Sequence, residues 1–101
     1  MELVKSSYKL ISEIPSDERF GLKSQIARCS VSIPSNIAEG SGRTSDKEFC
    51  HFLNISLSSS YELETQLILA QEIFEIESND LIIKLQNLQK MIGGFKRTLN
   101  K

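Results

Sequence analysis

Apolar residues recur along most of the chain at the three- and four-residue spacing of an amphipathic helix. In the last segment, the steps between successive apolar positions are 4, 3, 4, 3 and 4, a heptad-like spacing typical of helices that pack side by side. That seam consists of Leu81, Leu85, Leu88, Ile92, Phe95 and Leu99. No segment alternates apolar and polar residues for long enough to predict a β-strand. The pattern therefore predicts an all-α protein.

A second seam runs through residues 49–74 and has small residues in its middle. It consists of Phe49, Leu53, Ser56, Ser60, Leu63, Leu67, Ala70 and Phe74. Serines at the centre of a helix seam predict that a neighbouring backbone approaches closely there. Ser45 and Glu48 form a capping box just before the seam, so we expect this helix to begin after Ser45.

The same segment carries more apolar residues than one groove of a bundle can cover. Those outside the seam are Phe52, Ile55, Leu57, Tyr61, Ile68, Leu69 and Ile73. Such a helix either lies at the centre of the bundle or presents part of its surface to another copy of the chain. For a chain of 101 residues we prefer the subunit interface, because a small domain buries a small share of its own surface.

Two shorter helical patterns precede that helix. The seam of the second pattern consists of Leu22, Ile26, Cys29, Ile33 and Ile37. We expect this helix to begin near Ser16 or Asp17, directly after Pro15. The first pattern ends by Ile14 and is short, so its stability must depend on packing. Its apolar face is expected to consist of Val4, Tyr8 and Ile11.

Pro34 lies inside the second pattern and predicts a kink, because proline removes the hydrogen bond to the carbonyl of Ser30. Ser32, Ser35 and Asn36 flank the proline and could bond the freed groups. A buried Asn36 would fix the register of the helices at some cost in stability, whereas an exposed Asn36 would point to water. We prefer the buried position, since two isoleucines of the seam bracket this residue.

The connections between the four helical patterns are brief, and brief connections make neighbouring helices antiparallel. We therefore expect residues 1–101 to form one domain, an up-down-up-down antiparallel four-helix bundle with a kink near Pro34. Ser78 and Asn79 are good caps for the last helix. Gly93-Gly94 is expected to interrupt that helix, because glycine weakens a helix interior.

Composition agrees with a small cytoplasmic domain. The chain is 40% hydrophobic and 25% charged, and its net charge of −1 predicts no strong nonspecific attraction to nucleic acid or lipid. No apolar run approaches the roughly 20 residues of a membrane span, and the first residues lack the apolar core of a signal peptide, so we expect no membrane partner. The two cysteines, Cys29 and Cys50, suit a reducing compartment better than a disulfide scaffold.

The distribution of charge is more informative than the total. No lysine or arginine occurs between Lys47 and Lys84, and no acidic residue follows Asp80. The cations of the final segment are Lys84, Lys90, Lys96, Arg97 and Lys101. They either form a solvated face beside the acidic segment or contact the phosphate backbone of a nucleic acid. We prefer the first interpretation and keep the second as the alternative.

Residues that could carry chemistry are few. The Gly40-Ser41-Gly42 turn lacks the preceding strand and the lysine of a phosphate-binding loop, so we expect its glycines to end one helix and free the turn into the next. Glu48 and His51 have the spacing that di-iron bundles use, but those bundles need two copies and the chain has one histidine. Cys50 precedes His51, and adjacent residues of a helix do not face each other. We therefore expect no enzyme activity, no catalytic residue, no metal and no cofactor.

The stretch VSIPSNIAEGSGRTSDKEFCHFLNISLSSSYELETQLILA, residues 31–70, strongly resembles a bacterial four-helix-bundle family, the 23S rRNA-intervening-sequence proteins. The family hallmark is SIPSNIAEG-x-x-R-x-S-x-x-E-F, followed by ELETQL at residues 62–67. The resemblance extends over about residues 17–99. The matching signature residues, expected to serve structure or binding, are Ser32, Pro34, Ser35, Asn36, Glu39, Gly40, Arg43, Ser45 and Glu48.

This resemblance implies a fold and an assembly more than an activity. Members look like up-down bundles, and some form ring-like homopentamers, so the resemblance implies that the chain is its own partner. A similar protein is the pentameric accessory subunit of a reverse transcriptase in diversity-generating retroelements, and it uses a basic surface. We therefore expect a non-catalytic homo-oligomeric binding or scaffold protein. The alternative is a nucleic-acid or ribonucleoprotein accessory factor that uses the basic surface of the fourth helix.

Overall fold

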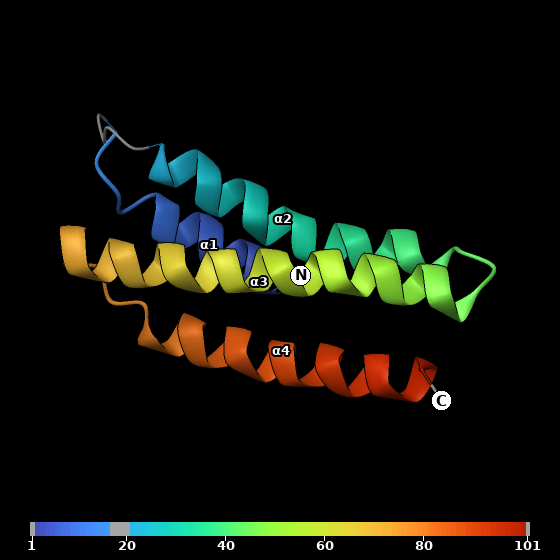
Figure 1. The fold of residues 1–101 in the computed structure, drawn as a ribbon. Coiled ribbons are helices and arrows are strands. Elements are labelled where there is room, and N and C mark those ends of the chain that lie inside the picture. The colour runs from blue at the N-terminus through green and yellow to red at the C-terminus, as the bar shows by residue number, and fades with distance from the viewer. Residues whose placement is uncertain (1, 17–20, 101) are drawn as a thin grey trace.

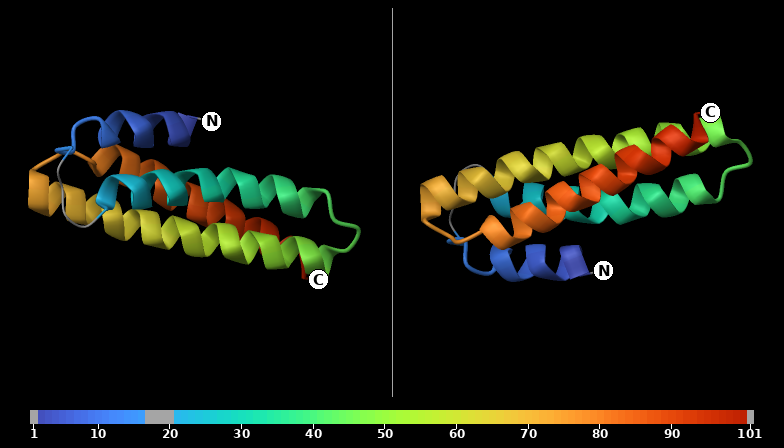
Figure 2. Two further views of the ribbon diagram at one scale, coloured as in Figure 1. Left: turned by 90° about the horizontal axis from the view of Figure 1, so that it is seen from above. Right: turned by 90° about the horizontal axis from the view of Figure 1, so that it is seen from below.

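The computed structural model describes residues 2–16 and 21–100, and these residues form four helices (Figure 1). The helices are α1 (Glu2–Ile11), α2 (Leu22–Ser41), α3 (Asp46–Phe74) and α4 (Asn79–Leu99). The two described stretches contain no strand. Each helix packs antiparallel against the one before it, and α1 also packs against α4 (Figure 2). The predicted all-α, up-down-up-down four-helix bundle is thereby confirmed.

The core is built from the predicted seams of α2, α3 and α4. The buried apolar residues of these seams are Leu22, Ile26, Cys29, Ile33, Leu53, Leu63, Leu67, Ala70, Leu81, Leu85 and Ile92. The seams are less buried toward the end of the bundle that holds the α2–α3 turn (Figure 1). There Phe95 is 43% exposed, and its ring packs edge-on against Phe49. The reason is the length of α1, which has 10 residues and runs beside only part of α2 and α4 (Figure 2).

The packing of α2 against α3 is the most extensive in the bundle. Ser56 and Ser60, at the centre of the α3 seam, are fully buried. The Ser56 hydroxyl donates a hydrogen bond of 2.9 Å to the backbone carbonyl of Ile33. So short a side chain reaches the backbone of another helix only where the two backbones lie close together. The close approach predicted from the serines is therefore confirmed.

The predicted apolar face of α1 is wrong. Its buried residues are Leu3, Ser7 and Leu10, and Ile14 continues the same face beyond the helix end. Tyr8, which was expected to face the core, is 51% exposed. Both sets of residues have helical spacing, but the observed set buries three large aliphatic side chains and leaves the tyrosine hydroxyl in contact with water.

Two predicted helix boundaries are also wrong. Ser16 is not helical and Asp17 lies outside the described residues, whereas α2 begins at Leu22 after Gly21, whose φ of 63° is left-handed. Gly21 is the N-cap of α2, and glycine adopts this conformation without strain. In α4, the helix continues through Gly93-Gly94, so the predicted interruption does not occur. Helix α2 also continues through Pro34, and a kink there stays a prediction.

Candidate functional site

The signature segment begins on α2 at the edge that faces α3. The Asn36 amide donates hydrogen bonds to the Ser32 carbonyl at 2.8 Å and to the Ser32 hydroxyl at 3.0 Å. The Ser32 hydroxyl in turn lies 2.8 Å from the Ser59 hydroxyl of α3. Asn36 is half-buried, so the prediction of a buried seam position is wrong, and its bonds go to Ser32 rather than to the carbonyl that proline frees. Ser35 is exposed.

Gly40 provides the close contact between the end of α2 and the start of α3. A Cβ atom at this position would lie 2.8 Å from Phe49 Cδ1 and 2.8 Å from Phe52 Cβ. The prediction that Gly40 ends the helix is wrong, because α2 runs on to Ser41. Gly42 follows as the C-cap with an ordinary φ of −86°. The glycine at position 40 is therefore explained by packing rather than by the turn.

The charged residues of the signature also have structural partners. The Arg43 guanidinium forms an ion pair with Glu39, four residues earlier, and lies 4.7 Å from the centroid of the Phe52 ring. The Ser45 hydroxyl accepts a hydrogen bond of 3.1 Å from the Glu48 amide, which confirms the predicted cap of α3. The signature residues thus cap α3, pack α2 against α3 and stabilise the turn between these two helices.

A polar cluster that the sequence pattern did not reveal joins the middle of these two helices. Arg28 and Glu62 form an ion pair of 3.1 Å, and the Gln66 amide donates to the Cys29 sulfur at 3.4 Å. Burial raises the pKa of the Cys29 thiol, so the thiolate that nucleophilic chemistry needs is disfavoured. The described residues contain no group of three His, Cys, Asp or Glu side chains able to hold a metal ion.

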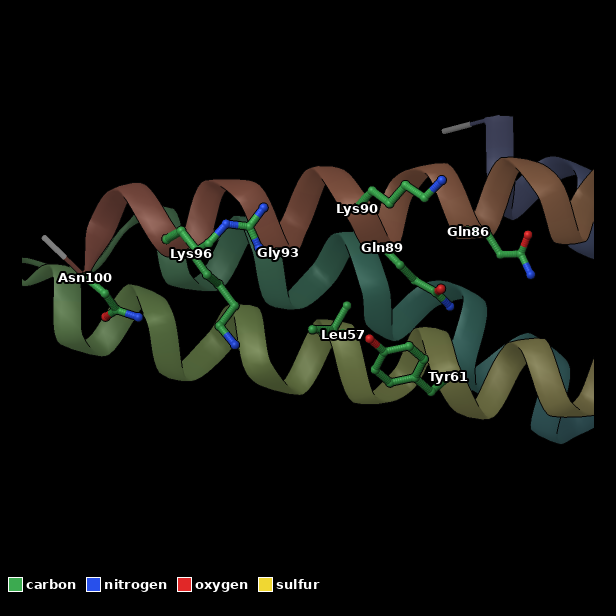
Figure 3. A pocket seen from close by; sticks show the side chains of 9 residues that line it. Leu57, Tyr61, Gln86, Gln89, Lys90, Gly93, Lys96 and Asn100 are labelled. Atoms are coloured by element: carbon green, nitrogen blue, oxygen red, sulfur yellow. The ribbon is translucent and has the colours of Figure 1, made fainter.

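A basic groove of about 630 Å³ lies between α3 and α4 (Figure 3). The residues that line this α3/α4 groove are Leu57, Tyr61, Gln86, Gln89, Lys90, Gly93, Lys96, Arg97 and Asn100. Three of the five cations predicted for nucleic-acid contact meet here, namely Lys90, Lys96 and Arg97, and we call them the groove cations. Within residues 2–16 and 21–100, no groove cation forms an ion pair.

Lys84, another of the predicted cations, does not line the groove. The Lys84 ammonium donates a hydrogen bond of 2.8 Å to the Glu2 carboxylate of α1. This hydrogen bond raises the pKa of Lys84 and lowers the pKa of Glu2. Lys84 lines different hollows, which lie between α1 and α4. Lys101 lies outside the described residues.

The α3 side of the groove is apolar, and the sequence pattern had not assigned it to a groove. Leu57 and Tyr61 project from α3 toward the side chains of Gln89 and Lys96 on α4 (Figure 3). Tyr61 is 54% exposed. The spacing of four residues between Leu57 and Tyr61 was the signal that they share a helix edge, but the sequence does not say that the basic edge of α4 lies opposite.

Four antiparallel helices with a pinned α2–α3 turn define a small helical-bundle protein. The chain belongs to the 23S rRNA-intervening sequence protein family, whose sequence profile matches residues 1–94. Lys96 and Arg97 lie beyond the matched residues. None of the curated proteins that we compared with the chain matches it. Among the described residues, no helix is both long and apolar enough to cross a membrane.

Proposed function

We propose that this protein is a non-catalytic binding or scaffold protein that acts as a homo-oligomer. The observation that carries the proposal is the apolar surface that α3 presents outside the core. Ile68, Leu69 and Ile73 are each 40–50% exposed and lie within one stretch of six residues, and we call them the outer α3 patch. Neighbouring exposed apolar side chains mark interaction sites, so burial against other copies accounts for this surface.

Two further observations support this proposal. The signature residues Glu39, Gly40, Arg43 and Ser45 are engaged in packing, ion-pair or capping contacts, which account for them without a reaction. Both cysteines are buried and free, which suits a reducing compartment, and we propose the cytoplasm. For the assembly we propose the ring of five copies that the family resemblance implies.

The native mass tests the assembly. Light scattering on the purified protein should give about 57 kDa, the mass of five copies of 11.4 kDa. Leu69→Glu with Ile73→Glu should lower that mass, because two buried carboxylates oppose association. Ile83→Glu is the matched control, since Ile83 is an exposed isoleucine of α4. A wild-type mass of one copy would contradict self-association. An unchanged mass in the double variant would show that the outer α3 patch is not the interface between copies.

The second candidate function is that of a nucleic-acid or ribonucleoprotein accessory factor, such as a partner of a reverse transcriptase. The observation that favours it is the α3/α4 groove, where three cations without an ion-pair partner among the described residues meet although the whole chain has a net charge of −1. A local cluster of cations attracts phosphate even when the total charge does not. Several copies in one assembly would strengthen a weak site by avidity.

Retention of nucleic acid tests this second function. Glutamate in place of all three groove cations should abolish retention of RNA by the wild-type protein and flatten its salt dependence. Lys84→Glu is the control, because Lys84 lies outside the groove and pairs with Glu2. If the triple variant retains RNA as well as wild type does, the groove is not the binding surface. If Lys84→Glu weakens retention as much as the triple variant does, the loss of RNA binding reflects the total charge of the protein rather than the groove.

A further inference from the structure

We propose that the α3/α4 groove binds single-stranded nucleic acid, with Tyr61 stacking on an unpaired base while the groove cations contact phosphates. The inference rests on the second candidate function above and adds the form of nucleic acid and the residue that recognises it. Proteins that bind single strands commonly combine a basic track with an exposed aromatic ring. The α3/α4 groove has both features: Tyr61 comes from α3 and the groove cations come from α4, where the Lys96 side chain reaches toward α3 (Figure 3).

Tyr61 is the aromatic residue of this groove. Its side chain projects from α3 toward α4 (Figure 3), and the residue is 54% exposed, so it contributes little to the core. Its hydroxyl makes no hydrogen bond to any residue that the structure describes. A tyrosine ring held at the wall of a basic groove can stack on a base that has left its helix, whereas the bases of an intact duplex present no free face.

The charges of the groove are arranged along its length. Lys90 and Arg97 are seven positions apart on α4, so their backbones are separated by about 10 Å along the helix axis. At the other end, the Glu64 carboxylate accepts hydrogen bonds from the Gln89 amide at 2.9 Å and the Gln86 amide at 3.4 Å. The Glu64 carboxylate repels phosphate, so phosphates are most favoured near Lys96 and Arg97, while Lys90 lies closer to the Glu64 end. Tyr61, from the facing helix, supplies the apolar surface for the base.

Gly93 gives independent support for an open groove. Glycine weakens a helix interior, yet α4 keeps Gly93 there. A Cβ atom at Gly93 would have the Arg97 Nη1 as its neighbour at 3.8 Å, which is ordinary contact, so packing among the described residues does not require glycine. A missing side chain in the floor of the groove leaves room for a ligand beside the helix backbone. Access to the groove thus accounts for a glycine that packing does not explain.

Fluorescence anisotropy of the full chain with labelled oligothymidylate and with a labelled duplex of equal length tests the inference. The single strand should bind more tightly than the duplex at every salt concentration. Tyr61→Leu keeps an apolar side chain but removes the ring, and it should weaken single-strand binding by roughly one to two orders of magnitude without changing the salt slope. Tyr61→Phe should bind like wild type, and so should Lys5→Gln, which removes an exposed cation of α1.

Tyrosine fluorescence provides a direct readout of stacking. The chain has no tryptophan and two tyrosines, so in the Tyr8→Phe variant the emission comes from Tyr61 alone. Adding unlabelled oligothymidylate to that variant should quench the emission, because a stacked base deactivates the excited ring. The Tyr61→Phe variant, which retains Tyr8, should keep its emission when the same oligonucleotide is added.

The outcomes separate this inference from the function on which it rests. If wild type binds neither strand form, the accessory function fails and the inference fails with it. If both forms bind equally, or if Tyr61→Leu binds oligothymidylate like wild type, nucleic-acid binding stands and stacking on Tyr61 is overturned. A reduced native mass of Tyr61→Leu would assign this residue to a subunit interface and would also overturn the inference.

Discussion

The Ser56 hydroxyl of α3 donates a hydrogen bond of 2.9 Å to the backbone carbonyl of Ile33 inside α2, and both residues are fully buried. This contact joins α2 and α3, the two helices with the most extensive packing, near the middle of the α3 seam. It also explains why the α3 seam changes from large apolar residues to serine in its middle. A larger side chain would hold the helices apart, and an apolar residue of the same size would forgo the bond.

Ser56→Ala and Ser56→Leu should therefore differ strongly in stability. Alanine removes one hydrogen bond but leaves the Ile33 carbonyl its own helical partner, so the free energy of unfolding should fall by about 0.5–1 kcal/mol. Leucine must separate the helices and should cost about 1–3 kcal/mol or more. Urea unfolding followed by circular dichroism measures both, with exposed Ser58→Ala as the control. A leucine variant as stable as wild type would contradict the close approach.

Two helical glycines should respond to alanine in opposite directions. At Gly40 a Cβ would lie 2.8 Å from Phe52 Cβ and from the Phe49 ring, so Gly40→Ala should lower stability in spite of the better helix propensity of alanine. At Gly93 the nearest atom to a new Cβ is 3.8 Å away, so Gly93→Ala should raise stability by up to about 1 kcal/mol. Thermal melts of the two variants check the contrast, and a shift of the same sign in both would refute it.

Much of the fold could be predicted from the sequence, because the seams of α2, α3 and α4 are long and consist of large aliphatic residues. The face of α1 could not be predicted, since Leu3-Ser7-Leu10 and Val4-Tyr8-Ile11 have the same spacing. Because the set that is buried includes Ser7, its sequence pattern indicated a partly polar face rather than a core face. The buried state of Ser7 depends on how α1 docks against α2 and α4, which local spacing does not contain.

Ser7→Ala should stabilise the protein. The Ser7 hydroxyl is buried on the inner face of α1, and no hydrogen-bond partner for it occurs among the described residues. A buried hydroxyl without a partner costs roughly 1 kcal/mol or more, so its removal should raise the free energy of unfolding by about 1 kcal/mol. Chemical denaturation measures the change. Ser6→Ala, at the half-buried neighbouring position, should gain only the small helix-propensity term, and an equal gain in both variants would exclude the burial argument.

The candidate site was predictable only in its parts. The cation run on the last segment could be recognised, and three of its members do meet in the α3/α4 groove. That Tyr61 lies opposite them depends on the rotation of α3 about its axis, which the packing of the whole bundle decides. Lys84 follows the same sequence pattern as the groove cations, yet Glu2, 82 positions earlier, engages its ammonium group. Contacts over such separations are set by the fold.

The Glu2–Lys84 pair should make the stability of the α1–α4 contact depend on pH at both extremes. The hydrogen bond to the Lys84 ammonium lowers the pKa of Glu2, so this contribution is present above the unfolded-state pKa of Glu2 and is lost as the pH falls through the folded-state pKa. The pKa of Lys84 is raised, mainly by the same hydrogen bond, so its contribution is present below the unfolded-state pKa and is lost as the pH rises through the folded-state pKa.

An NMR titration of the Glu2 side-chain carboxyl measures this coupling. In Lys84→Gln, the Glu2 midpoint should rise toward the ordinary value of a glutamate, whereas Lys5→Gln, which removes an exposed lysine of α1, should leave it in place. Because both partners are exposed, the change in overall stability should be small and should shrink further with added salt. A Glu2 midpoint that is the same in wild type and Lys84→Gln would mean that the two side chains do not pair in solution.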